Sequence, residues 1–376
     1  MNSATASDPP VSAADDLRFM RLALALGRRG LGNTWPNPAV GAVIVKDGIV
    51  IGRGWTMPGG RPHAETEALR HAGEAARGAT LYVTLEPCSH HGKTPPCADA
   101  IVAAGVARVV SALEDPNPQV AGQGYARLRA AGIEVVSGLC AEEARGAHAG
   151  HIRRILDGRP HITLKLAVSA DGKAALAGRK PVQITGEETR ARVHLMRAMN
   201  DAILVGIGTV LADDPELTCR LPGMGSQSPV RVILDRDLRL PLTSKLVQGA
   251  RDVPVWVYCG PDASADRENA LNEQGMQVQR VRREGETLAL PDVVQSLANK
   301  GITRLMVEGG PNVAASFIEA DLVDEAALFR GPVVIGMDGI DALDGLSLDA
   351  LTSSAHLRLI GSETVGADTI SHFERS

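Results

Sequence analysis

Aromatic residues are scarce in this 376-residue sequence, where Phe, Tyr and Trp together make up 3%. No apolar run reaches the roughly 20 residues that a bilayer-spanning helix needs, and the N-terminal stretch lacks the basic start and apolar core of a signal peptide. An excess of positive charge is also absent, because the net charge is −5. These absences argue against a membrane protein and against a protein whose main partner is a nucleic acid.

The cysteines are few and odd in number, which does not suit a disulfide framework. The five are Cys88, Cys97, Cys140, Cys219 and Cys259. We therefore expect a reducing compartment and a cytoplasmic protein. The remaining composition, 44% hydrophobic and 22% charged, is that of an ordinary globular protein.

The length of the chain favours two domains, because 376 residues are many for a single hydrophobic core. The sequence predicts a loose N-terminal tail over residues 1–14, a first domain over 15–158 and a second domain over 159–376. A charged helical stretch precedes this boundary, and a new apolar run follows residues 158–160.

Strand patterns alternate with helical patterns in both halves, which is typical of a sheet covered by helices. In the first domain we expect helices over 15–29, from about 64, over 97–104 and over 124–131. Strands are expected over 79–87, 107–113 and 133–138, and two more over 39–55, joined by a tight turn at Asp47-Gly48. In the second domain we expect strands over 201–208, 230–236, 253–259 and 304–310, a helix over 312–321 and a strand-rich end. Both domains are therefore predicted to be of the α/β class.

His63, Cys88 and Cys97 offer one imidazole and two thiolates. Three protein ligands leave one corner of a tetrahedral zinc ion open, as in catalytic rather than structural sites. Zinc in such a site lowers the pKa of its bound water to about 7. Cys97 follows two prolines at a predicted helix start, where the helix dipole and the free amides favour a thiolate.

Glu65 stands two residues after His63, which is about 200° around a helix, so the two side chains cannot share a helical face. His63 is therefore expected at the very start of the helix, with Glu65 in its first turn. There Glu65 is predicted to carry protons without binding the metal. This H-x-E plus P-C…C arrangement is that of the zinc nucleobase deaminases, although eight residues separate the cysteines here rather than two.

Other interpretations of these residues stay open at this point. Isolated cysteines are commonly buried as small apolar residues, and a single H-x-E has little weight alone. His90 or His91 can also replace one of the ligands, although both lie in a polar loop.

The second domain has no G-x-G-x-x-G after its first strand, so a standard dinucleotide fold is not supported. It does contain Gly309-Gly310 between a strand and a helix, where backbone amides can approach a phosphate. Arg197 is expected to join Lys165 and Arg220 in gripping a phosphate. These residues indicate a small phosphate-bearing ligand, with solvated surface charge as the alternative.

Several motifs of the chain are familiar together: PNPAVGAVIVKDG, PHAE, YVTLEPCSHHGKTPPC, DPNPQVAGQG, KLAVSADGK, TVLADDPELTCR and VEGGP. They resemble the bifunctional deaminase–reductases of riboflavin biosynthesis, the RibD family, from about residue 15 to the C-terminus. The resemblance implies a cytidine-deaminase-like three-layer α/β/α domain followed by a dihydrofolate-reductase-like α/β domain.

The resemblance also implies two reactions on a small phosphorylated pyrimidine. The first is zinc-dependent removal of an amino group from 2,5-diamino-6-ribosylamino-4(3H)-pyrimidinone 5′-phosphate. In the second, NADPH reduces the ribose to a ribityl chain, giving 5-amino-6-(5-phosphoribitylamino)uracil. The implied cofactors are one zinc ion per chain and NADPH. No nucleic acid or membrane partner is implied, and a homodimer or tetramer would suit the family.

The family pattern assigns roles to individual residues of this chain. It makes Glu65 the catalytic residue of the deaminase. It places substrate on Asn37, Arg197, Leu217, Arg220 and Glu308. Lys165 is expected among the substrate contacts from the phosphate argument above. It places the cofactor on Ala167, Thr209, Asp213, Gly310, Pro311 and Asn312, with Asp235 or Arg236 near its ribose phosphate.

One departure from the family pattern lies in the second domain. Where the family usually has a serine and a tryptophan, this chain has Pro181 and Gln183, so the usual contacts of that loop are not carried over.

Three rival hypotheses for the function of the chain stay open. The chain is a tRNA or nucleoside deaminase with an accessory or inactive second half, a zinc-stabilised binding protein without chemistry, or an enzyme with one active half.

Overall fold

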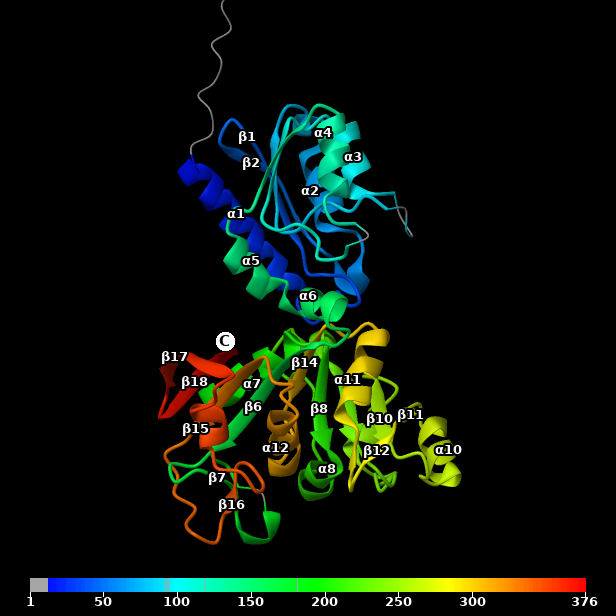
Figure 1. The fold of residues 1–376 in the computed structure, drawn as a ribbon, viewed down its shortest axis with the longest axis vertical. Helices are drawn as coiled ribbons and strands as arrows, with labels where there is room; N and C mark the ends of the chain where they lie inside the picture. The colour runs from blue at the N-terminus through cyan, green and yellow to red at the C-terminus, as the bar shows by residue number, and fades with distance from the viewer. Residues whose placement is uncertain (1–12, 91, 93–94, 119, 181) are drawn as a thin grey trace, which may run out of the picture. The chain divides into compact units, whose positions relative to one another are not determined.

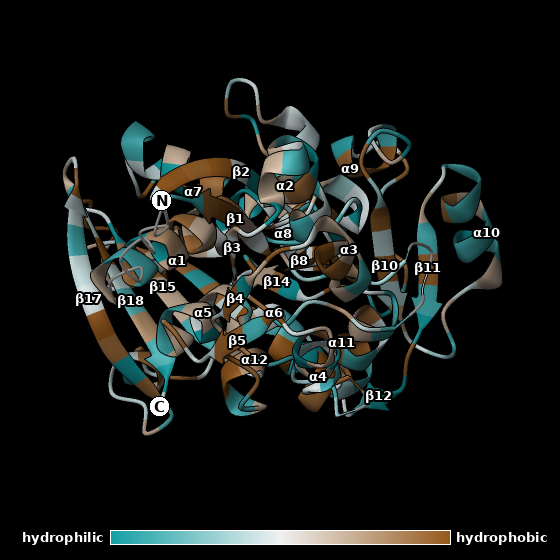
Figure 2. Cartoon of the chain, turned by 90° about the horizontal axis from the view of Figure 1, so that it is seen from above, coloured by the Kyte–Doolittle hydropathy of each residue, from teal (hydrophilic) through white to brown (hydrophobic). Residues whose placement is uncertain are grey.

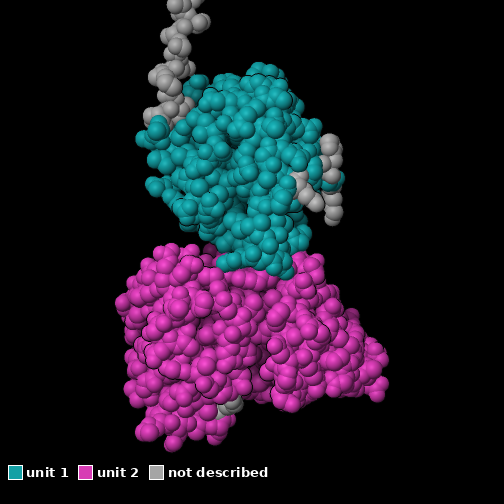
Figure 3. All heavy atoms as spheres, viewed as in Figure 1, with its two compact units in different colours: residues 1–158 teal, residues 159–376 magenta. Residues whose placement is uncertain are grey.

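The structure is a computed structural model that describes residues 13–90, 92, 95–118, 120–180 and 182–376. The chain divides into two compact units, residues 1–158 and 159–376 (Figure 3). Most of the predicted tail lies outside the described residues, but helix α1 already begins at Ala13. None of the described helices is long and apolar enough to cross a membrane.

Unit 1 is built on a five-stranded sheet with the order β2-β1-β3-β4-β5. Strand β1 pairs antiparallel with β2 and β3, whereas β3, β4 and β5 run parallel. The strands are β1 (Gly41–Lys46), β2 (Ile49–Trp55), β3 (Thr80–Val83), β4 (Arg108–Ser111) and β5 (Glu134–Ser137). The helices are α1 (Ala13–Gly27), α2 (Ala64–Ala72), α3 (Cys97–Ala104), α4 (Gln123–Ala130), α5 (Ala141–Ala147) and α6 (Ala149–Leu156).

Helices cover both faces of this sheet, because successive side chains of a strand point to opposite faces. Ala42 and Ile44 of β1 join a core with α2, α3 and α4, whereas Val43 and Val45 join a core with α1 and α5. Figure 1 shows the two helix layers on opposite sides of the sheet. Unit 1 thus has the three-layer α/β/α architecture that the family resemblance implied.

Two local features explain how the first strands form. Asp47 and Gly48 both have positive φ, 53° and 73°, as expected for the predicted hairpin turn. At Gly41, a Cβ would lie 1.9 Å from the carbonyl oxygen of Ala23 in α1. The absence of a side chain at Gly41 therefore lets α1 pack directly against β1.

Unit 2 contains a nine-stranded sheet with the order β11-β10-β9-β8-β14-β6-β15-β18-β17. The strands from β11 to β15 run parallel, and β18 and β17 continue the sheet antiparallel. The strands are β6 (His161–Val168), β8 (Ala202–Gly206), β9 (Val230–Leu234), β10 (Val255–Cys259), β11 (Gln277–Arg280), β14 (Arg304–Val307), β15 (Glu325–Arg330), β17 (Leu357–Val365) and β18 (Asp368–Arg375).

Two short antiparallel pairs accompany this sheet: β7 (Lys173–Ala175) with β16 (Ile340–Asp341), and β12 (Arg283–Glu284) with β13 (Thr287–Leu288). The helices of unit 2 are α7 (Glu187–Ala198), α8 (Ile207–Asp213), α9 (Lys245–Gln248), α10 (Ala265–Glu273), α11 (Leu290–Asn299), α12 (Pro311–Glu319) and α13 (Asp349–Thr352).

The inner strands β8, β10 and β14 are buried almost throughout, as expected for parallel strands covered by helices on both faces. Figure 2 contrasts the hydrophobic β10 with the mostly hydrophilic α10.

The predicted strand over 201–208 ends two residues too late, because Gly206 is the N-cap residue of α8. The central strand β6 was not among the predicted strands.

Candidate functional sites

Three potential zinc ligands come together in unit 1. His63 is the N-cap residue of α2, Cys97 is the first residue of α3, and Cys88 lies in the loop after β3. Their ligand atoms all lie within 4.8 Å of one another. The Nδ1 atom of His63 is 3.7 Å from the Cys88 sulfur and 3.3 Å from the Cys97 sulfur. One imidazole and two thiolates this close together fit a tetrahedral zinc ion.

Within the described part of the chain, no fourth His, Cys, Asp or Glu joins this group. His90, one of the alternative ligands, does not belong to the group, and His91 lies outside the described residues. A set of three protein ligands is the arrangement of catalytic zinc sites, where a non-protein ligand completes the tetrahedron.

The two thiols are strongly coupled. The Cys97 amide donates to the Cys88 sulfur at 3.3 Å. The hydrogen bond with the Cys97 side chain lowers the pKa of Cys88 to about 4, and His63 contributes in the same direction. The same pairing raises the pKa of the Cys97 thiol. Cys88 is therefore readily deprotonated to a thiolate. A bound cation would favour deprotonation of Cys97 as well.

Glu65 lies in the first turn of α2, and only 3% of the residue is exposed. Burial raises the pKa of its carboxyl group to about 7, and this group is hydrogen-bonded to Cys97. A carboxyl group with a pKa near neutrality can both accept and return a proton. Glu65 thus lies beside the three ligands without belonging to them.

Asn37, the predicted pyrimidine contact, is held against the same ligand set. Its Nδ2 atom donates to the Gly60 carbonyl at 2.7 Å and lies 3.5 Å from His63 Nε2. A Cβ on Gly60, where φ is 82°, would lie 2.6 Å from this amide nitrogen. Glycine at position 60 therefore makes room for Asn37 beside the imidazole.

Glu86, which the sequence analysis missed, ties the zinc-ligand turn to a neighbouring loop. The residue is 5% exposed and lies two positions before Cys88. Its carboxylate accepts hydrogen bonds from the backbone amides of Asp115 (3.2 Å), Gly122 (2.9 Å), Gly124 (2.8 Å) and Tyr125 (3.3 Å). A Cβ on Gly124 would lie 2.1 Å from the Pro87 carbonyl oxygen. The only sequence signal is a glutamate directly before Pro-Cys at a strand end.

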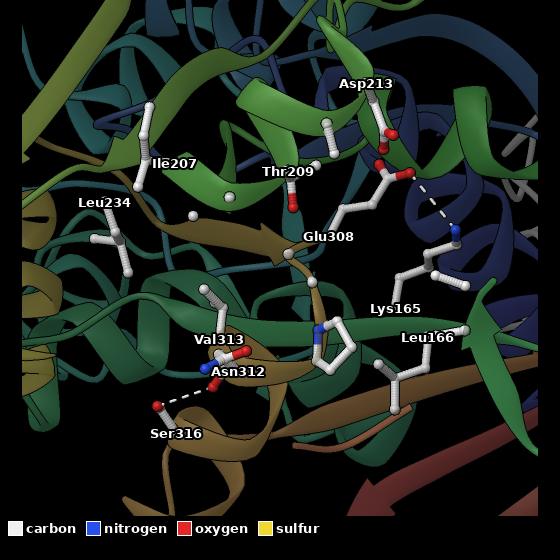
Figure 4. Close-up of a pocket in the computed structure, with 18 of the residues that line it drawn as sticks. Lys165, Leu166, Ile207, Thr209, Asp213, Leu234, Glu308, Asn312, Val313 and Ser316 are labelled. Atoms are coloured by element: carbon white, nitrogen blue, oxygen red, sulfur yellow. Dashed lines mark hydrogen bonds and ion pairs between the residues drawn. The ribbon is translucent and has the colours of Figure 1, made fainter. Parts of the chain in front are cut away.

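Unit 2 contains a large pocket of about 1510 Å³ at the carboxyl ends of β6, β8, β9 and β14 (Figure 4). Ligands of open parallel sheets generally bind at this edge. Most of the residues assigned by the family pattern line it, namely Lys165, Ala167, Arg197, Thr209, Asp213, Leu217, Glu308, Gly310, Pro311 and Asn312. The pocket thus brings together residues from widely separated parts of the sequence.

A largely buried charge cluster lies within this pocket. Arg197 donates to both carboxylate oxygens of Glu308, at 2.9 and 3.0 Å. Lys165 Nζ lies 3.5 Å from the same carboxylate (Figure 4). Burial opposes ionisation of Glu308, but the two cations outweigh it and lower its pKa. Arg220 does not line the pocket and pairs with Glu216 at 2.9 Å. The expected three-cation phosphate grip is therefore not assembled, because Glu308 engages two of its members.

Two helix N-termini line the pocket. Gly310 is the N-cap residue of α12, and Gly206 is that of α8. The Thr209 hydroxyl lies 3.3 Å from the place that a Cβ on Gly310 would occupy. The first residues of both helices therefore line one pocket, where backbone amides at helix starts can approach a phosphate. Gly206, Ile207 and Gly208 form the junction of β8 and α8.

The structure separates the two predicted contacts to the cofactor's ribose phosphate. Asp235 is fully buried and accepts a hydrogen bond from the Leu240 amide at 2.8 Å, whereas Arg236 lines the pocket. Gln183 also lines the pocket, and Pro181 lies outside the described residues.

Models of known protein families match both halves of the chain. The family model of the RibD C-terminal domain matches residues 160–371, and that of the cytidine and deoxycytidylate deaminase zinc-binding region matches residues 13–113. These matches favour two enzymatic units over a tRNA or nucleoside deaminase with an accessory second half.

Whole-chain relatives agree with these matches. The riboflavin biosynthesis protein RibD of Aquifex aeolicus is 41% identical over 360 residues, covering 96% of this chain and 98% of that protein. The Escherichia coli protein of the same name is 40% identical, covering 95% and 98%. The solved structure of Acinetobacter baumannii RibD superimposes with a TM-score of 0.87 at 36% identity, covering 97% and 100%. The chain therefore belongs to the RibD family of bifunctional riboflavin-biosynthesis enzymes.

Proposed function

We propose that unit 1 deaminates 2,5-diamino-6-ribosylamino-4(3H)-pyrimidinone 5′-phosphate. Unit 2 then reduces the ribosyl group with NADPH to give 5-amino-6-(5-phosphoribitylamino)uracil. The structure of a Thermotoga maritima protein that is named as this deaminase and this reductase superimposes with a TM-score of 0.83 at 34% identity. The observation that carries the proposal is the close set of His63, Cys88 and Cys97 with the buried Glu65 beside it.

In unit 1, His63, Cys88 and Cys97 would hold the zinc ion. When bound, zinc supplies an activated water molecule that attacks the ring carbon bearing the amine. Glu65 accepts a proton from the attacking water and delivers it to the ring nitrogen. It then transfers a second proton to the departing amine, so that ammonia leaves and a carbonyl remains. Asn37, fixed beside His63, orients the pyrimidine.

In unit 2, the nicotinamide cofactor would supply a hydride to the sugar carbon attached to nitrogen. The ribose ring opens first, so that its ring oxygen becomes a hydroxyl and this carbon becomes an imine, whose nitrogen takes up a proton as the hydride adds. The amides of the α8 and α12 N-termini bind cofactor phosphates, and we assign the cofactor to Ala167, Thr209, Asp213, Gly310, Pro311 and Asn312. The Lys165–Glu308–Arg197 cluster presents fixed charges to the hydroxyl groups of the sugar. We also assign substrate to Leu217, which lines the pocket, and to Arg220.

We propose the domain boundaries 15–158 for the deaminase and 159–376 for the reductase. All five cysteines are free, which suits the cytoplasmic location that we propose.

Mass spectrometry of the products, with and without NADPH, tests both steps at once. We expect only the deaminated ribosyl product without NADPH and the ribityl product with it. Glu65→Gln should abolish ammonia release but preserve NADPH oxidation on the deaminated intermediate. Glu67→Gln, a like change on the same helix at a residue paired with Arg70, is the matched control. Normal deamination by Glu65→Gln would overturn the assignment of the proton carrier, and absence of NADPH oxidation would overturn that of unit 2.

A further inference from the structure

The segment after α8 holds Leu217 in a strained conformation at the wall of the unit 2 pocket. Leu217 has a positive φ of 57°, and only 3% of the residue is exposed. The left-handed region is unfavourable for a bulky side chain, so neighbouring contacts must hold the backbone there. On the N-terminal side, the buried Arg231 guanidinium donates to the Glu216 carbonyl at 3.3 Å. On the C-terminal side, helix α7 provides contacts to residues 218–220.

Two side chains of α7, Arg197 and His194, lie about one helical turn apart and both contact this segment. Arg197 Nη1 donates to the Thr218 carbonyl at 3.2 Å, while its Nε and Nη2 atoms donate to Glu308. His194 Nδ1 lies 3.2 Å from the Thr218 carbonyl oxygen and 3.2 Å from the backbone nitrogen of Arg220. One imidazole nitrogen thus has two potential partners, a carbonyl acceptor and an amide donor.

The other hydrogen bonds of the segment decide which partner Nδ1 serves. A neutral imidazole has one donor nitrogen and one acceptor nitrogen, and the partners around the ring determine which is which. The Thr218 carbonyl already has Arg197 as a donor. For the Arg220 amide, His194 Nδ1 is the one acceptor that the described residues provide. The tautomer with its proton on Nε2 and a lone pair on Nδ1 therefore satisfies both backbone groups.

The surroundings of His194 favour this neutral form. Burial lowers the pKa of His194 below the usual value of about 6.5, and two cations act in the same direction, Arg197 from α7 itself and Arg220 from the facing segment. The Thr218 carbonyl and the Glu308 carboxylate, at the end of β14, oppose this shift without reversing it. His194 is therefore neutral at neutral pH. A protonated imidazole has no lone pair, so the Arg220 amide loses its acceptor when His194 is protonated.

We propose that neutral His194 is a positioning residue for substrate binding by the reductase, because its Nδ1 accepts the Arg220 amide and so holds Leu217 in place at the pocket. His194 does not itself line the pocket, so it acts through the backbone of this segment. Protonation of His194 releases the segment and weakens binding of the phosphorylated ribosyl substrate. The inference rests on the proposed reductase function and adds a residue outside the pocket that controls substrate affinity.

The kinetics of NADPH oxidation on the deaminated intermediate, measured with the full-length chain between about pH 5.5 and 8.5, test this inference. In His194→Asn, the Oδ1 atom takes the place of Nδ1 and accepts the amide at every pH. Its KM should equal that of the wild type at neutral pH. His194→Leu has no acceptor and should raise KM about two- to tenfold at neutral pH, the effect of one hydrogen bond, with kcat unchanged.

The pH dependence separates His194 from the substrate. The substrate's phosphate also titrates, with a pKa of about 6, but it does so equally with every variant. The ratio of the wild-type KM to that of His194→Asn therefore isolates the histidine. This ratio should rise from one as the pH falls through the pKa of His194. His372→Asn is the matched control: it removes an imidazole of β18 that is 42% exposed and pairs with Glu363, and it should keep the wild-type KM at every pH.

Long-range proton–nitrogen NMR correlation gives the tautomer without substrate, with the His194 signal identified by its loss in His194→Asn. We expect a proton on Nε2 and none on Nδ1 at about pH 8. A proton on Nδ1, a KM ratio that stays constant with pH, or equal KM values for His194→Asn and His194→Leu would each overturn the inference alone. A wild-type chain that oxidises no NADPH would contradict the proposed reductase function, and the inference with it.

Discussion

Glu86→Gln tests how unit 1 holds its metal ligands. Glutamine replaces one of the two acceptor oxygens by an amino group, so two of the four backbone amides that Glu86 binds would face a donor. Each buried donor without an acceptor costs about 1–3 kcal/mol. We therefore expect the free energy of unfolding of unit 1 to fall by roughly 2–6 kcal/mol. Because Cys88 follows two residues later, zinc affinity should fall by about 10- to 100-fold, the effect typical of groups that orient ligands.

The assay combines two measurements on the full-length chain. Competition with a zinc chelator gives the affinity, and hydrogen exchange of the 115–125 amides in urea gives the local stability. NADPH oxidation by unit 2 serves as an internal control, and Glu114→Gln makes the same charge change at an exposed residue of the neighbouring loop. Wild-type zinc affinity together with wild-type protection in Glu86→Gln would refute the reasoning.

Three further perturbations have defined outcomes. Gly41→Ala places a Cβ 1.9 Å from the Ala23 carbonyl oxygen. The free energy of unfolding of unit 1, measured by urea titration, should therefore fall by about 1–3 kcal/mol. An unchanged value would contradict the close packing of α1 on β1. Removal of zinc by a chelator should stop ammonia release, reversibly on adding zinc, while NADPH oxidation on the deaminated intermediate continues; loss of both would show that the metal serves both units. Arg197→Met leaves the largely buried Glu308 with one cation instead of two, and removing one partner of a buried ion pair costs about 3–5 kcal/mol of folding stability. The free energy of unfolding of unit 2 should therefore fall by up to about this amount in urea titrations, and the reductase kcat/KM should fall because the charge of the pocket has changed; wild-type stability with wild-type kinetics would exclude a role for this pair.

The deaminase half was largely predictable from the sequence because its signals are local. Asp47-Gly48 favours a two-residue hairpin turn, and the prolines at 95 and 96 place the start of α3 at Cys97, where the structure has it. The rotation between His63 and Glu65 determines which of the two can precede the helix. Local sequence patterns were therefore enough to predict the three zinc ligands, which the structure brings together.

The residues that sequence reasoning missed or misplaced depend on contacts distant in the chain. Glu86 collects amides from a loop about 30 residues later, and its own neighbourhood in the sequence reads as an ordinary strand end. Arg197 is engaged by Glu308, more than 100 residues away, so no local pattern could show that its charge is compensated. Asp235 and Arg236 are adjacent, yet only the packing of the loop after β9 decides which one reaches the pocket.

The central claim is that His63, Cys88 and Cys97 hold a zinc ion whose fourth ligand is not a protein atom, with Glu65 as its proton carrier. X-ray absorption at the zinc edge, on the purified chain and on Glu65→Gln, tests this directly. We predict two sulfur neighbours at about 2.3 Å and two nitrogen or oxygen neighbours at about 2.0–2.2 Å, unchanged in a variant that no longer releases ammonia. Three or more sulfur neighbours, a coordination shell that changes in Glu65→Gln, or a chain that binds no zinc would contradict it.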